Sequence, residues 1–176
     1  MVRSRAIVLV LCSVLFCCFA SAESDMPPAA TALLNHLTGT WILQGTIAGK
    51  QKTHDVQAEW VLDHEYVQLH EVSRDKNSTG GTAYEAIVYI GWDAKTDQYT
   101  CLWLDNTAGS GLAPEGIAHG KLTGDSIPFI FTLSASDQTH NTFTYDKAAD
   151  SWQWVIDNIA NGQTQPFAKL RLNRVR

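Results

Sequence analysis

Ten short segments with β-strand character follow one another along the sequence, and turn-forming residues separate them. Glycine, asparagine and aspartate fill most of the connections, as in Gly49-Lys50, Thr123-Gly124-Asp125 and Asn161-Gly162. Closure of a long antiparallel meander removes its exposed edges. We therefore predict an all-β fold, an antiparallel up-and-down β-barrel of about ten strands, over the alternative of a two-sheet sandwich. The segments are 41–47, 53–62, 65–74, 83–92, 98–105, 114–122, 126–133, 139–146, 151–158 and 164–174.

The segments 83–92 and 98–105 form the clearest hairpin. The first alternates with period two, and its even-numbered positions are all apolar. A five-residue polar turn (DAKTD) joins the two segments. In the second segment, Tyr99, Cys101 and Trp103 alternate with leucines, so both faces are apolar. The pattern leaves open which of these faces points inward.

Residues 1–22 have the three parts of a secretory signal. These parts are Arg3 and Arg5, an apolar run over 6–20, and the small residues Ala20-Ser21-Ala22. The alternative is an uncleaved membrane anchor, but the run is shorter than the ~20 residues that a spanning helix needs. We therefore predict an exported protein, periplasmic or extracellular.

The remainder, 23–176, has a length that suits one domain with one hydrophobic core. Three of the four cysteines lie in the predicted signal, which leaves Cys101 without an internal disulfide partner. Loss of the two arginines of the signal changes the net charge from −5 to −7. An acidic domain argues against nucleic acid or anionic lipid as a partner. We expect no stable membrane insertion after signal cleavage, and the oligomeric state stays open.

A short helix is expected ahead of the first strand, over 26–37. Pro28 suits its first turn, and Gly39 ends it. Later in the chain, Pro128 lies within a predicted strand. Because proline has no backbone N–H to donate to the ladder, we expect a bulge or a gap at that position.

All six tryptophans lie in the predicted domain. A buried tryptophan hides about 150–250 Å² of surface, so these side chains would supply much of the core of a small barrel. The alternative is that some of them line an apolar cavity. Trp152, Trp154 and Ile156 share one face of a strand, and that face ends in the amide of Asn158. An apolar cavity with few polar groups is typical of small-molecule sites.

Four motifs together resemble a known group of barrels. They are GTWxxxG at 39–45, EWVL at 59–62, IGWD at 90–93, and WLDxxxGxG with a following PEG over 103–116. The first resembles the opening motif of the calycin superfamily, which includes the lipocalins and the fatty-acid-binding proteins. The full set resembles a bacterial domain-of-unknown-function family whose members form a single lipocalin-like barrel. The resemblance implies a lipocalin-like fold in which Trp41 plugs one end, and it implies no particular reaction.

The resemblance also implies a region for the ligand. Its last motif marks Trp103, Asp105, Gly109, Glu115 and Gly116 as a structural signature or a ligand mouth. A relative that binds fatty acids would carry an Arg-x-Tyr pair near its C-terminus. The segment Arg171-Leu172-Asn173 lacks that tyrosine, which argues against a fatty carboxylate.

Further candidate ligand-binding residues follow from strand parity. We expect Trp154 and Asn158 to face the lumen, and His70 and His119, which lie in the middle of their strands, to do the same.

Two carboxylates of the ligand mouth allow a second interpretation. Asp105 and Glu115 would form an acid–base pair if the loop between them folded back. The simpler interpretation is that Asp105 caps a turn and that Glu115 binds backbone amides.

The six histidines form neither an HxH nor an HExxH pattern, and we expect no metal and no cofactor. The alternative is haem iron held by His70 or His119, as in the nitrobindin-like barrels, but the histidine of that group lies closer to the C-terminus than His140 does. No GxSxG motif or phosphate loop is present, and no catalytic residue is assigned.

These features predict an exported lipocalin-like barrel that binds a small hydrophobic or amphipathic ligand in its lumen. One alternative is a lumen-based enzyme of the calycin type, a lyase or an isomerase, and another is a structural or protein-binding barrel. A lumen filled by tryptophans would exclude the first two. Buried ionisable groups around an open lumen would favour the enzyme.

Overall fold

The computed structural model describes residues 26–107 and 112–176, so the predicted signal at 1–22 lies outside the described residues. One helix precedes ten strands in this part of the chain, and a short 3₁₀ turn, η1, separates two of the strands. The elements are α1 (Pro28–Leu37), β1 (Gly39–Ile47), β2 (Lys50–Val61), β3 (Tyr66–Ser73), β4 (Glu85–Asp93), β5 (Gln98–Asp105), η1 (Pro114–Gly116), β6 (Ile117–Gly120), β7 (Ser126–Thr132), β8 (Asp137–Asp146), β9 (Ser151–Ala160) and β10 (Gln163–Arg174).

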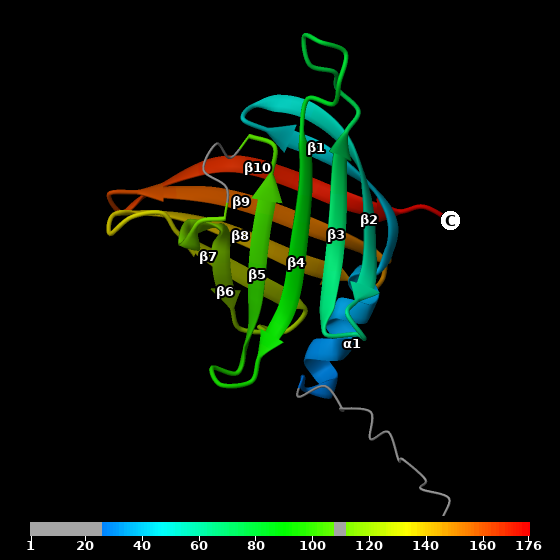
Figure 1. Ribbon diagram of the computed structural model, residues 1–176, viewed down its shortest axis with the longest axis vertical. Helices are drawn as coiled ribbons and strands as arrows, with labels where there is room; N and C mark the ends of the chain where they lie inside the picture. Colours follow the sequence, from blue (N-terminus) through cyan, green and yellow to red (C-terminus); the bar gives the residue numbers. More distant parts are fainter. Residues whose placement is uncertain (1–25, 108–111) are drawn as a thin grey trace, which may run out of the picture.

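The ten strands form one closed antiparallel barrel, which confirms the predicted architecture and excludes the sandwich (Figure 1). Each strand pairs with its neighbours in sequence, and β10 returns to pair with β1. The closing ladder runs from Trp41 opposite Arg174 to Ile47 opposite Ala168. Helix α1 lies at one end of the barrel (Figure 1). No helix in the described ranges has the length and apolar character needed to cross a bilayer.

Side chains alternate between the lumen and the outer surface. In β4, Ala86, Val88 and Ile90 are buried, as predicted for the even-numbered face. In β5, Tyr99 and Cys101 are buried, so the odd-numbered face points inward. The inward face of β5, which the sequence left open, is therefore the odd-numbered one. The thiol of Cys101 is free, and burial raises its pKa well above the ordinary value.

Four aromatic side chains from four strands hold α1 against the barrel. Trp41 and Trp152 donate indole hydrogen bonds of 2.8 and 3.2 Å to main-chain carbonyls in the last turn of the helix. Tyr99 donates its hydroxyl to a carbonyl in the first turn, at 2.9 Å. Trp60 donates to an amide side chain of the helix, also at 2.8 Å. The last carbonyls of a helix need partners outside it, and here the barrel supplies them. The α1 end of the barrel is therefore closed.

Packing against Arg174 explains why a glycine and a tryptophan occur together in the opening motif. The guanidinium of Arg174 lies over the ring of Trp41, with its Cζ 4.0 Å from the ring centroid. It also donates to the carbonyl of Thr38 at 2.8 Å. A Cβ at Gly39 would lie 2.3 Å from Nη1 of Arg174, so a larger residue there would displace the cation. The motif thus lies where the first strand, β1, pairs with the last strand, β10.

Pro128 interrupts pairing on one side of its strand. The β7–β8 ladder runs through it without a shift in register. The β6–β7 ladder, in contrast, has two residue pairs and ends at His119 opposite Ile130. The predicted gap therefore lies between β6 and β7. A register irregularity also occurs in β10, between Pro166 and Ala168.

Acid is expected to weaken the contact between Arg174 and Asp150. Nε of Arg174 lies 2.7 Å from Oδ2 of Asp150, and this hydrogen bond lowers the pKa of Asp150 below its ordinary 3.8. Because the folded pKa lies below the unfolded one, the pair adds stability above about pH 4 and loses it as the pH falls through the folded value. The pair is partly exposed, so its contribution is at most about 1 kcal/mol.

Asp150→Asn tests this contact, because asparagine tolerates the left-handed φ of 44° at the position. Its Tm, followed by circular dichroism, should lie below that of the wild type at pH 6, and the two values should converge as the pH falls below the lowered pKa of Asp150. A difference that stays constant over this fall in pH would show that the charge of Asp150 does not stabilise the fold.

Candidate functional site

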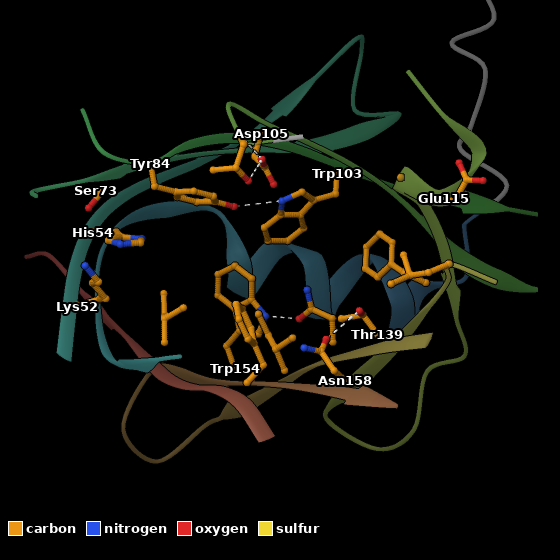
Figure 2. Close-up of a pocket in the computed structure, with 18 of the residues that line it drawn as sticks. Lys52, His54, Ser73, Tyr84, Trp103, Asp105, Glu115, Thr139, Trp154 and Asn158 are labelled. Atoms are coloured by element: carbon orange, nitrogen blue, oxygen red, sulfur yellow. Dashed lines mark hydrogen bonds between the residues drawn. The ribbon is translucent and has the colours of Figure 1, made fainter. Parts of the chain in front are cut away.

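A pocket of about 610 Å³ occupies the end of the barrel opposite α1. Its walls come from the strand ends that lie away from the helix, such as Ile47 in β1, Ser73 in β3 and Asp105 in β5. Figure 2 looks into this pocket and shows the helix behind it. The volume falls within the range of about 300–1,000 Å³ that ligand sites occupy. The tryptophans therefore line part of the lumen and do not fill it.

Aromatic rings form the centre of the pocket. The ring centroids of Trp103 and Trp154 are 5.4 Å apart. Trp154 stacks on Phe143 at 4.6 Å, and Trp103 meets Phe131 edge-on at 6.4 Å. This cluster gives the pocket a rigid apolar surface on which a flat ligand can lie. Other apolar lining residues are Ile47, Ala83, Ala113, Leu133, Ile156 and Phe167.

A buried histidine–glutamate pair lies beside the pocket, between β2 and β3. The side chains of His54 and Glu71 are 3% and 4% exposed, and Nδ1 of His54 contacts Oε1 of Glu71. The imidazole also stacks on Tyr84 with a centroid distance of 5.7 Å. A carboxylate accepts hydrogen bonds, so Nδ1 carries a proton, and Nε2 is the ring nitrogen that does not contact Glu71.

The second ring nitrogen of His54 faces the pocket. No fully buried side-chain nitrogen or oxygen of the described residues lacks a partner. Nε2 of His54 makes no hydrogen bond within that part of the chain, so it must be reachable from the pocket that the residue lines.

Trp103, Tyr84 and Asp105 form a hydrogen-bonded chain near the mouth. The indole of Trp103 donates to Oη of Tyr84 at 3.2 Å, and the Tyr84 hydroxyl bonds the Asp105 carboxylate. Oδ1 of Asp105 also accepts from the backbone N–H and the hydroxyl of Thr107, at 2.7 and 2.6 Å. Burial and the nearby carboxylates Glu71 and Asp105 raise the pKa of Tyr84 far above its ordinary value. The phenol therefore stays protonated, and its hydroxyl is already occupied.

Two amides on β8 and β9 supply further polar groups. Oδ1 of Asn141 accepts from the indole of Trp154, and Oδ1 of Asn158 accepts from the hydroxyl of Thr139 at 3.1 Å. An indole N–H can only donate, which fixes the orientation of the Asn141 amide. Both amides keep their NH₂ groups for a ligand, because neither group bonds to another described residue.

The charges around the pocket do not suit an anion. Lys52 is the one lysine or arginine among the described lining residues. Its Nζ lies 2.5 Å from Oδ2 of Asp75, and this contact lowers the pKa of Asp75. Three carboxylates, those of Glu71, Asp105 and Glu115, lie in or next to the pocket. An anionic ligand would therefore meet like charges and no free cation.

Five of the predicted site residues line this pocket: Trp103, Asp105, Glu115, Trp154 and Asn158. Gly116 lines it as well, whereas the predicted Gly109 lies outside the described residues.

The two carboxylates do not form a pair. Glu115 is exposed in η1, and Figure 2 shows it on the other side of Trp103 from Asp105. Asp105 caps the turn after β5 through Thr107, as the simpler interpretation predicts for that residue.

The predicted lumenal position of His70 and His119 is corrected by the structure. His70 lies on the outer face of β3, where its Nε2 is 2.7 Å from Oε1 of Glu85. His119 is exposed on β6, and its Nδ1 lies 3.3 Å from the hydroxyl of Thr100. Their strands alternate as predicted, but the opposite parity faces inward. Neither histidine lines the pocket, so neither is placed to hold a ligand or haem iron there.

Strand parity carries a signal for the residues that the sequence analysis missed. His54 shares its parity with the buried residues Val56 and Ala58, and Glu71 shares its parity with Val67 and Leu69. A polar residue on an apolar face is a candidate for the lumen. Within the described ranges, no group of three or more metal-ligating side chains comes together.

The described residues form a single closed β-barrel with an open, mostly apolar cavity. No protein-family model matches the sequence, and no curated protein matches it. Among solved structures, the chain resembles the crystal structure of Rv2717c from M. tuberculosis, with a TM-score of 0.55 and 18% sequence identity. The match covers 86% of this chain and 100% of the other. At this level of identity, the similarity supports the fold alone.

Proposed function

We propose that this barrel binds a small apolar or amphipathic molecule in its lumen. The observation that carries the proposal is the pocket of about 610 Å³, which has an aromatic centre and a mostly apolar surface. The closed α1 end leaves the opposite end as the entrance. Sites of this form hold ligands by burial of apolar surface, and a few polar contacts fix the orientation.

Export and family membership belong to the same proposal. The predicted signal at 1–22 supports a periplasmic or extracellular location. The four sequence motifs support membership of the lipocalin-like domain-of-unknown-function family.

Binding is tested with Nile red, a neutral dye whose fluorescence rises in apolar surroundings. We expect saturable binding to the wild type and clearly weaker binding to Ile156→Trp, because the larger side chain takes up part of the pocket beside the aromatic rings. Ile156 points into the lumen from β9, and its neighbour Val155 points outward. Val155→Trp is therefore the matched control and should bind the dye as the wild type does. Equal binding by both variants would place the dye outside the lumen.

The His54–Glu71 pair favours a second candidate, an acid–base enzyme that uses the same pocket. A carboxylate that holds one imidazole nitrogen leaves the other free to move a proton. Native mass spectrometry of protein from its own host would identify a co-purified molecule. A binding protein should return that molecule unchanged, whereas an isomerase or lyase should convert it.

A further inference from the structure

The pocket presents one hydrogen-bond acceptor on its β2 side. Glu71 holds Nδ1 of His54, and the imidazole stacks on Tyr84, so the ring is fixed from two directions. A histidine with a carboxylate on one nitrogen presents a defined lone pair on the other. In the neutral imidazole, Nε2 of His54 is therefore placed to accept a hydrogen bond from a ligand.

The pocket presents hydrogen-bond donors on its β8–β9 side. The oxygens of Asn141 and Asn158 are engaged by Trp154 and Thr139, which leaves both NH₂ groups as donors. Figure 2 shows His54 and Asn158 on different sides of the pocket, with the rings of Trp103 and Trp154 between them.

Apart from Glu115, which is exposed in η1, the charged groups and the phenol around the pocket are already paired. The Tyr84 hydroxyl accepts from Trp103 and bonds Asp105. Lys52 already pairs with Asp75, so an anion would have to replace that carboxylate. Glu71 is held by His54, and Asp105 also accepts from Thr107, so neither carboxylate is free to hold a cation. These contacts favour a neutral ligand.

We propose that the ligand is a neutral, flat aromatic compound with a hydroxyl group at one end and a carbonyl group at the other. The hydroxyl donates to Nε2 of His54, the carbonyl accepts from the amides of Asn141 and Asn158, and the ring system lies against Trp103 and Trp154. This assignment rests on the proposed binding function and adds the chemical class of the ligand.

Four probes test the assignment by calorimetry on the wild type. They are an acetylnaphthol with its hydroxyl and acetyl groups at opposite ends of the ring system, the methyl ether of that compound, naphthol without the acetyl group, and the naphthoate anion. We expect the acetylnaphthol to bind about tenfold more tightly than its methyl ether, the effect of one hydrogen bond. We expect a similar advantage over naphthol, and the naphthoate should bind most weakly.

A paired substitution assigns the hydroxyl contact to His54. In His54→Phe/Glu71→Leu, a phenyl ring takes the place of the imidazole that stacks on Tyr84. The hydrogen-bond acceptor and its carboxylate partner are both removed. Replacement of both partners by apolar side chains avoids an unpaired buried group. The acetylnaphthol should then bind about as tightly as its methyl ether, while the affinity of the ether should change little. Asn158→Leu should instead reduce the advantage of the acetylnaphthol over naphthol.

The chain offers a matched control on its outer surface. His70 and Glu85 form a second histidine–glutamate pair, with Nε2 and Oε1 2.7 Å apart, on strands β3 and β4. His70→Phe/Glu85→Leu should leave the tenfold preference unchanged.

The outcomes separate the two proposals. If the wild type binds Nile red but binds the acetylnaphthol and its ether equally, the ligand class is wrong and the binding function stands. Tightest binding of the naphthoate, or of an aromatic amine added to the series, also overturns the ligand class. If neither Nile red nor any probe binds, the binding function itself fails. If the lumenal double variant fails to fold, the order of probe affinities for the wild type still tests the proposed ligand class.

Discussion

Gly45→Ala is expected to prevent proper closure of the barrel between β1 and β10. A Cβ at this position would lie 2.2 Å from the carbonyl oxygen of Lys169 and 2.9 Å from the Cα of Leu170. Both neighbours are backbone atoms, so no side-chain rotation relieves the clash. The φ of 150° at Gly45 adds strain for any other residue. We expect a loss of at least about 3 kcal/mol, or roughly 10 °C in Tm, measured by thermal and urea unfolding.

Gly162→Ala is the control for backbone strain alone. Gly162 has a φ of 75°, but a Cβ there would meet no atom within 4 Å. The expected cost is about 1 kcal/mol. If the two alanine variants lose equal stability, the contact with Lys169 is not the cause.

Trp41→Ala is expected to have the second large effect, because it opens the closed end. The side chain is fully buried, donates 2.8 Å to the carbonyl of Leu37, and lies under the guanidinium of Arg174. Loss of a buried tryptophan costs about 3–5 kcal/mol, which is a large share of the stability of an ordinary domain. Unfolding by urea measures the loss, and hydrogen exchange in α1 should rise because the helix loses one of its anchors.

Trp92→Ala controls for tryptophan loss in general. Trp92 is partly exposed and meets Tyr99 edge-on at 5.1 Å, so its removal should cost less than half as much. Arg174→Met, combined with Trp41→Ala in a double-mutant cycle, should give a coupling of about 0.5–2 kcal/mol. Equal costs for the two tryptophan variants would show that Trp41 stabilises the fold no more than a partly exposed tryptophan does.

Most of the fold could be predicted because strand alternation and turn residues are local signals. The segments 83–92 and 98–105, for example, differ from β4 and β5 by at most two residues. The face of β5 could not be predicted, since leucines alternate with Tyr99, Cys101 and Trp103. Only the closure of the barrel decides which apolar face is covered.

The site could be predicted in part. Trp103 and Asp105 follow from a motif within one strand, but the contact between His54 and Glu71 joins two strands. Its position depends on the register of β2 against β3, in which Val56 lies opposite Glu71. A slip of one residue would place the other parity inward, and turn residues alone do not exclude such a slip. The same dependence on register accounts for the incorrect prediction that His70 faces the lumen.

The ladder between β1 and β10 also bears on how the chain reaches its native state. The two partners are the first and the last strands of the barrel, so every other hairpin can form before the two meet. Contacts between residues so far apart in sequence form late and slow the overall rate. Until β10 has emerged and docked, both terminal strands keep unpaired edges that other chains can join. A nascent or truncated chain without β10 is therefore the species most exposed to aggregation.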